Sequence, residues 1–103
     1  MILYNVWFSF KPGSDDASEL GKLRLFFDDL KSRAKLHAYR LMKNRSTNGK
    51  SKLPAYHVMA EFTGNDQMSL PFAEVGEIGI HTGSHGTMIE NVSDFTVEIF
   101  EDI

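Results

Sequence analysis

The chain has 103 residues, which is the size of a single domain, and we take residues 1–103 as one domain. Its 11 basic and 14 acidic residues give a net charge of −3, which argues against nucleic-acid binding, since that function needs a clustered basic surface. Hydrophobic residues make up 42 %, enough for a globular core. Cysteine is absent, which excludes disulfides, Cys-ligated zinc, iron–sulfur clusters and thiol catalysis.

The beginning of the chain, Met1 to Phe8, is apolar but carries no basic residue and no small-residue cleavage site. This pattern is typical of a strand and not of a signal peptide. No apolar run approaches the roughly 20 residues that a membrane-spanning helix needs. We therefore expect a cytoplasmic protein that makes no contact with a membrane.

Residues 2–10 are rich in β-branched and aromatic side chains and end at Lys11-Pro12-Gly13, which predicts a first strand. Residues 15–36 predict a helix, because apolar side chains recur there at spacings of three and four. Ser14 or Asp15 is suited to cap its start. The apolar positions of this helix are Leu20, Leu23, Phe27, Leu30 and Ala34.

Residues 37–45 predict a second strand, and residues 55–62 predict a third. Between them, Asn48-Gly49 is a strong turn signal, so residues 46–53 are expected to form the tip of a hairpin. The two strands should therefore lie side by side.

Residues 67–92 contain four glycines, each of which costs a regular helix ~1 kcal/mol relative to alanine. We expect two short helices separated by a loop near residues 76–84, with Ser84 capping the second. Residues 94–101 alternate between apolar and polar side chains and predict a fourth strand. The side chains expected to face inward from the second helix and its end are Met88, Ile89 and Val92.

The resulting order, β-α-β-β-α-β, predicts an α+β, ferredoxin-like domain with a four-stranded antiparallel sheet. Two helices can cover only one face of such a sheet, and the second face should then be polar. It is instead mixed, which favours burial against a second copy of the chain. The sequence therefore predicts a homodimer through this sheet face, with polar side chains lining a cavity between the sheets. The residues of that face include Leu3, Asn5, Trp7, His57, Met59, Glu61, Thr96, Glu98 and Phe100.

Three segments carry a family resemblance: Phe10-Lys11-Pro12-Gly13 before the long helix, the strand Tyr56 to Phe62 leading into the second helix, and His81 followed by His85 and Met88-Ile89. Together they resemble the dimeric α+β barrel superfamily, which includes antibiotic-biosynthesis monooxygenases and stress-responsive barrel proteins. The resemblance implies a cavity at the sheet face. Members use this cavity for cofactor-independent oxidation, haem degradation, isomerisation or no catalysis.

Asn5 and Trp7 share one face of the first strand. The resemblance implies that Asn5 hydrogen-bonds a substrate oxygen and that Trp7 forms an aromatic wall of the cavity. Haem-degrading members also carry an asparagine on the first strand and a histidine on a helix, which Asn5 and His81 or His85 would match. Their tryptophan lies after the third strand, where this chain has Phe62, and this departure argues against both the haem and the oxygenase function. The alternative is that Trp7 anchors a dimer interface and that Asn5 satisfies a buried polar contact.

His57 and Glu61 also share a strand face, although they are four residues apart. A histidine in a partly apolar cavity can act as a general base near neutral pH. The alternative is an interfacial hydrogen-bond network that joins His57 and Glu61 to Arg40 and Glu98. These arguments make Asn5 and His57 the candidate catalytic residues.

His81 and His85 have the spacing that lets two imidazoles share a metal on one helix. Gly83 lies between them and argues against a regular helix, and no third ligand has a suitable spacing. We therefore expect no metal, and place these histidines at the cavity mouth or on the surface.

Two functions remain open from the sequence, besides a purely structural role. The first is binding of a small organic molecule in the cavity. The second is a cofactor-independent monooxygenase or isomerase acting on an aromatic or polyketide-like substrate, with Asn5 and His57 positioning and deprotonating it. Neither function calls for a cofactor. The expected ligand-binding residues are Trp7, Arg40, Met59, Glu61, Glu98, His81 and His85.

Overall fold

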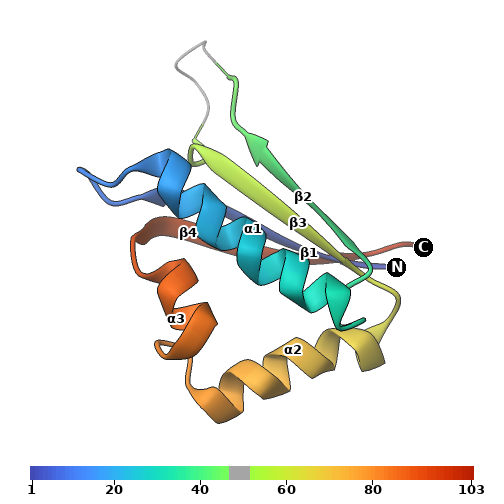
Figure 1. Ribbon diagram of the computed structural model, residues 1–103. Helices are drawn as coiled ribbons and strands as arrows, with labels where there is room; N and C mark the ends of the chain where they lie inside the picture. Colours follow the sequence, from blue (N-terminus) through green and yellow to red (C-terminus); the bar gives the residue numbers. More distant parts are fainter. Residues whose placement is uncertain (47–51) are drawn as a thin grey trace.

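The computed structural model of the chain describes residues 1–46 and 52–103. In these residues, strands form one sheet and all the helices lie against one of its faces (Figure 1). The observed order confirms the predicted ferredoxin-like arrangement, and the second helical region consists of two helices. The elements are β1 (Ile2–Phe10), α1 (Asp16–Ser32), β2 (Ala38–Lys43), β3 (Tyr56–Phe62), α2 (Asn65–Ile78), α3 (Gly83–Ile89) and β4 (Val92–Glu101).

The strand order in the sheet is β2-β3-β1-β4, and every neighbouring pair is antiparallel. The central pair places Trp7 of β1 opposite His57 of β3, and Asn5 opposite Met59. Residues directly opposite each other point to the same face of a sheet. This register therefore gathers the candidate residues of β1 and β3 on one face. The predicted hairpin tip at Asn48-Gly49 lies outside the described residues.

Helix α1 buries Leu23, Phe27 and Leu30, as their spacing predicts. It ends at Ser32, four residues before the predicted boundary, because Ala34 adopts the left-handed conformation with φ +58°. A residue in that conformation cannot continue a right-handed helix. Ala34 is therefore exposed and does not extend the buried face of the helix, contrary to prediction.

The region after β3 differs from the prediction in its boundaries. Helix α2 continues through Gly76 to Ile78, so the predicted loop at 76–84 shrinks to residues 79–82. Gly79 ends the helix with φ +107°, a conformation that glycine adopts without strain. Helix α3 begins after Thr82, which occupies the N-cap position predicted for Ser84.

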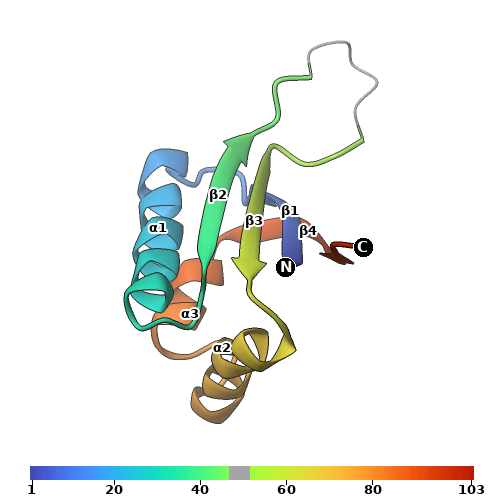
Figure 2. The ribbon, with the colours of Figure 1, turned by 90° about the vertical axis from the view of Figure 1, so that its right-hand side faces the viewer.

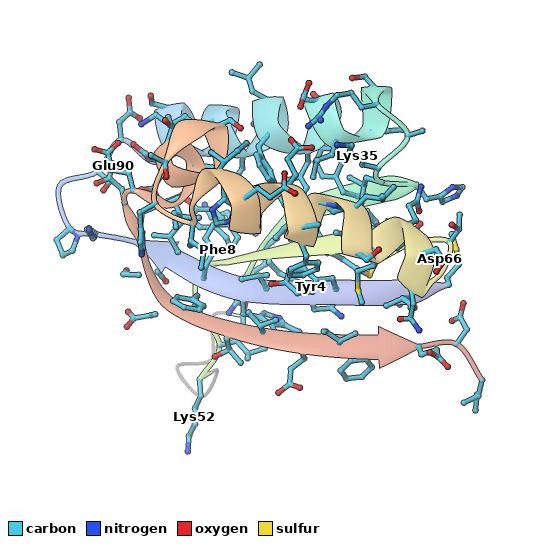
Figure 3. The ribbon with its side chains drawn as sticks, turned by 90° about the horizontal axis from the view of Figure 1, so that it is seen from below. Tyr4, Phe8, Lys35, Lys52, Asp66 and Glu90 are labelled. Atoms are coloured by element: carbon cyan, nitrogen blue, oxygen red, sulfur yellow. The ribbon has the colours of Figure 1, made fainter. Side chains whose placement is uncertain are left out.

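The hydrophobic core lies between the sheet and the helices, with Phe8 almost completely buried (Figure 3). Met88 is buried, and Ile89 and Val92 pack against the core, which confirms the inward face predicted for this region. No helix in the described part of the chain is long and apolar enough to span a membrane. The core consists of Ile2, Phe8, Leu23, Phe27, Leu30, Leu36, Tyr56, Val58, Ala60, Phe62 and Met88.

Strand β4 is an edge strand that the helices leave partly uncovered. Val97 and Ile99 lie opposite Val6 and Tyr4, so they point to the helix side, yet Ile99 is 54 % exposed. Helix α2 runs over β1, with Tyr4 between them. Strand β4 lies on the far side of β1 from this helix (Figure 3). Near its start β4 contains a bulge, where Asp94 takes φ +49° and the register with β1 shifts.

Candidate functional site

The side of the sheet opposite the helices is open in the single chain (Figure 2). Because Phe8 of β1 and Val58 of β3 are buried on the helix side, their odd-numbered neighbours face away from the helices. Tyr39 and Leu41 of β2 likewise pack against the core, which leaves the residue between them on the open face. The candidate residues on this face are Asn5, Trp7, Arg40, His57, Met59, Glu61 and Glu98.

Asn5 is the most deeply buried of these residues, at 6 % exposure. Its side-chain nitrogen Nδ2 donates to the main-chain oxygens of Leu3, at 3.2 Å, and of Glu98, at 3.3 Å. Its oxygen Oδ1 lies 3.0 Å from His57 Nε2. The structure thus joins the two candidate catalytic residues by a direct hydrogen bond.

Trp7 stacks on the His57 ring, with 4.5 Å between ring centroids and an interplanar angle of 14°. The two side chains are directly opposite each other on neighbouring strands, which brings them into contact. Burial lowers the pKa of the His57 imidazole below its ordinary value of 6.5, because burial penalises the charged form. His57 is therefore neutral at physiological pH and can accept a proton.

The charged side chains of the open face make no ion pair and no side-chain hydrogen bond within the described residues. These are Arg40, Glu61 and Glu98, and only the main-chain oxygen of Glu98 takes part in the contacts around Asn5. The network that the sequence suggested around His57 is therefore not formed within one chain. His57 is hydrogen-bonded to Asn5 instead.

His81 and His85 lie in the helical layer, apart from the open face. His81 is exposed in the turn before α3. His85 packs its ring edge-on against Phe26 of α1, at 5.6 Å between centroids, and its Nδ1 lies 2.7 Å from the Ile80 carbonyl oxygen. The structure does not bring these histidines to Asn5 and His57. Among the described residues there is no cluster of His, Asp and Glu that could hold a metal ion.

An open hollow that the sequence did not indicate lies at one end of the sheet, beside the β4 bulge. Ser9 of β1 contributes to it, and the Ser9 hydroxyl accepts a hydrogen bond from the Ala55 amide at 3.2 Å. Asp94, which lines the hollow, has a positive φ that no periodic pattern in the sequence signals. Its lining residues are Ser9, Lys52, Leu53, Pro54, Asp94, Phe95 and Thr96.

The model of DUF6614, described as a family of unknown function, matches residues 1–103. The chain belongs to the DUF6614 family. Its sequence matches none of the curated proteins.

Solved structures similar to this DUF6614 protein confirm the predicted fold. The crystal structure of At3g17210 from Arabidopsis thaliana superposes with a TM-score of 0.76 at 10 % identity, covering 100 % of this chain and 96 % of that chain. A dimeric ferredoxin-like protein of unknown function from Jannaschia sp. CCS1 gives 0.65 at 16 % identity, covering 99 % and 100 %.

A third similar structure is an ethyl tert-butyl ether D (EthD) family protein from Bacillus halodurans, with a TM-score of 0.56 at 10 % identity and coverage of 100 % of both chains. Identities this low show a common fold and nothing further. The predicted resemblance to dimeric α+β barrel proteins is confirmed at that level.

Proposed function

We propose that this DUF6614 protein is a homodimer that packs the open faces of two sheets together and binds a small organic molecule between them. The observation that carries the proposal is the composition of the open face. It sets a buried Asn5, hydrogen-bonded to the half-buried His57, and a stacked Trp7 among apolar side chains such as Met59. Ligand sites typically combine a few fixed polar groups with apolar walls.

Exposed apolar and unpaired charged side chains together support the dimer. Phe100, opposite Leu3 on this face, is 59 % exposed. Arg40 has no carboxylate partner within the described part of its own chain, and Glu61 and Glu98 have no cation there. In the proposed dimer, Arg40 of each copy pairs with a carboxylate of the other, and two-fold symmetry would form such a pair twice. The Jannaschia protein, which has the same fold, is described as dimeric, and this supports a dimer here.

Native mass spectrometry of the freshly purified protein tests this proposal. We expect a dimer that carries additional mass from a bound molecule. Phe100→Glu should give a monomer, because it places a charge in the interface while its side chain is exposed in the single chain. Leu25→Glu is the matched control, since Leu25 is 74 % exposed on α1, in the helical layer, and should leave the dimer intact. A monomeric wild-type protein would contradict the proposal.

A second candidate is favoured by the neutral His57 and its bond to Asn5: a cofactor-independent monooxygenase or isomerase acting on an aromatic or polyketide-like substrate. Both reactions can begin with removal of a substrate proton by a general base. His57→Ala should then abolish turnover while weakening ligand binding by no more than about tenfold, the value of one hydrogen bond, and Asn5→Ala should reduce turnover. Unchanged turnover in both variants would contradict this assignment of residues.

A further inference from the structure

We infer that His57 Nδ1 is the hydrogen-bond acceptor of the site and binds the acidic hydroxyl of a planar phenol or enol. Asn5 is the positioning residue, because it holds the imidazole as the tautomer with its proton on Nε2. This inference rests on the proposed function, since it names the class of ligand that the space between the sheets would take.

The hydrogen bonds of Asn5 fix which end of its amide faces His57. The atom assigned as Nδ2 faces the main-chain oxygens of Leu3 and Glu98, at 3.2 and 3.3 Å. Carbonyl oxygens can only accept hydrogen bonds, so the group that faces them must be the NH₂ donor. The amide oxygen Oδ1 must therefore face His57.

The tautomer of His57 follows from that orientation. Asn5 Oδ1 has no hydrogen to give, so His57 Nε2, 3.0 Å away, must be the donor. A neutral imidazole carries one proton, which leaves Nδ1 with an unshared electron pair. The stacked indole of Trp7, at an interplanar angle of 14°, restricts rotation of the ring out of this position.

His57 Nδ1 is open to a ligand. No described residue is hydrogen-bonded to it. The only buried side-chain nitrogen or oxygen without a partner among the described residues is Glu19 Oε2, so Nδ1 reaches the surface of the chain. An unpaired acceptor at the surface of this face needs a donor once the face is covered.

The partner of Nδ1 must therefore present an O–H or N–H group. An acidic hydroxyl makes the shorter and stronger hydrogen bond to a neutral nitrogen, and a planar ring fits beside the aromatic surface of Trp7. Phenols and enols combine both properties.

Nitrogen-15 NMR of the full-length protein, which separates protonated from unprotonated ring nitrogens, tests the tautomer directly at about pH 7.5. We expect His57 to carry its proton on Nε2. His85 is an internal reference for the opposite tautomer, because its Nδ1 faces the Ile80 carbonyl oxygen at 2.7 Å. Asn5→Leu should shift His57 toward a mixture of tautomers. A wild-type proton on Nδ1, or an unchanged tautomer in Asn5→Leu, would overturn the inference.

Titration with phenol and with anisole, which differ by the hydroxyl hydrogen, tests the ligand class. Phenol should bind about threefold to tenfold more tightly, the value of one net hydrogen bond, and His57→Phe should remove the difference. Equal binding of the two probes, or binding of neither, overturns the ligand class. The proposed function is judged separately by the dimer and its bound mass, so the two failures are distinguishable.

Discussion

Two polar side chains, Asn5 and Glu19, are buried on opposite sides of the sheet. Asn5 uses both of its amide atoms in hydrogen bonds. Glu19 accepts bonds at Oε1 from Asn91, at 2.8 Å, and from Lys22, at 3.1 Å, while its Oε2 has no partner among the described residues. Glu19 therefore ties the first turn of α1 to the residue that precedes β4, although half of its carboxylate is unsatisfied.

We predict that Glu19→Ala destabilises the protein by about 1–3 kcal/mol, because it leaves the Asn91 amide without its acceptor. Glu19→Gln keeps an oxygen in the same place and removes a buried charge, so it should cost less than about 1 kcal/mol. Urea unfolding followed by circular dichroism measures both values. An equal loss of unfolding free energy in the two variants would show that the hydrogen bond to Asn91 does not stabilise the protein.

His57 should make stability depend on pH. Its pKa is lower in the folded chain than the 6.5 of the unfolded chain, so the unfolded chain binds more protons between those two values. The resulting stabilisation is complete above about pH 6.5 and is lost as the pH falls through the folded pKa. We predict that the stability of the wild type relative to His57→Gln decreases on acidification from about pH 7.5 to about pH 5. An increase over that range would contradict the burial of a neutral ring.

The sequence predicts on which face of the sheet Asn5, Trp7 and His57 lie. It does not predict which side chains they contact. The two-residue period of a strand is enough to place Asn5, Trp7 and His57 on the open face. Which side chain contacts His57 depends on the register between β1 and β3, and the sequence suggested Arg40 and Glu98. The diagonal contact with Asn5 follows from that register, which the pattern of either strand alone does not fix.

At the scale of elements, α2 depends on an ion-pair cluster at the end of α1. Pro71 is its only buried residue. Arg33 makes two parallel bonds to Glu74, at 2.8 and 2.9 Å, and Lys35 also contacts that carboxylate. The hydrogen bond from Arg33, followed by that from Lys35, lowers the pKa of Glu74 to about 2. The cluster thus fixes α2 beside the end of α1.

We predict that Glu74→Gln destabilises the protein by less than about 1 kcal/mol at low salt and by still less at high salt, since the pair is near the surface. The stabilisation from Glu74 should be present above about pH 4.5 and disappear as the pH approaches 2, because its folded pKa is depressed. Hydrogen exchange of the α2 amides, which should accelerate in the variant, provides the measurement.

The control for this variant is Glu77→Gln, because Glu77 is exposed on the same helix and forms no ion pair in the described residues. It should leave the α2 amides as protected as they are in the wild type. If the α2 amides exchange at the same rate in Glu74→Gln as in this control, the ion-pair cluster does not stabilise the helix.

The boundaries of α2 show the limit of local propensity. One glycine costs a helix about 1 kcal/mol, which tertiary contacts on either side of Gly76 can offset. Gly79 ends the helix because its backbone turns to a positive φ, and Gly76 does not. The sequence identified glycines as breaks but did not distinguish between these two.

The whole molecule is a slab with principal extents of 39 × 35 × 19 Å. One layer is the sheet and the other is the helices (Figure 2). The mixed composition of the open face could be predicted from strand alternation alone. The exposure of Val97 and Ile99 could not, because it depends on α2 lying over β1 and leaving the edge strand uncovered.

If the two slabs associate, unfolding must depend on protein concentration. A dimer that dissociates on unfolding is stabilised by mass action, so its thermal midpoint should rise by a few degrees over a hundredfold increase in concentration. Leu25→Glu should show the same rise, whereas Phe100→Glu should unfold at a midpoint independent of concentration. Differential scanning calorimetry gives these midpoints, and a constant midpoint for the wild type would refute association.

Trp7 is the one tryptophan of the chain, and it is stacked on His57. All indole fluorescence of the protein therefore originates at the proposed ligand site. A charged imidazolium in contact with an indole quenches its emission, whereas a neutral imidazole does so far less. The protein thus carries an intrinsic optical probe, with which the protonation of a single histidine and the arrival of a ligand can be followed in solution without any label.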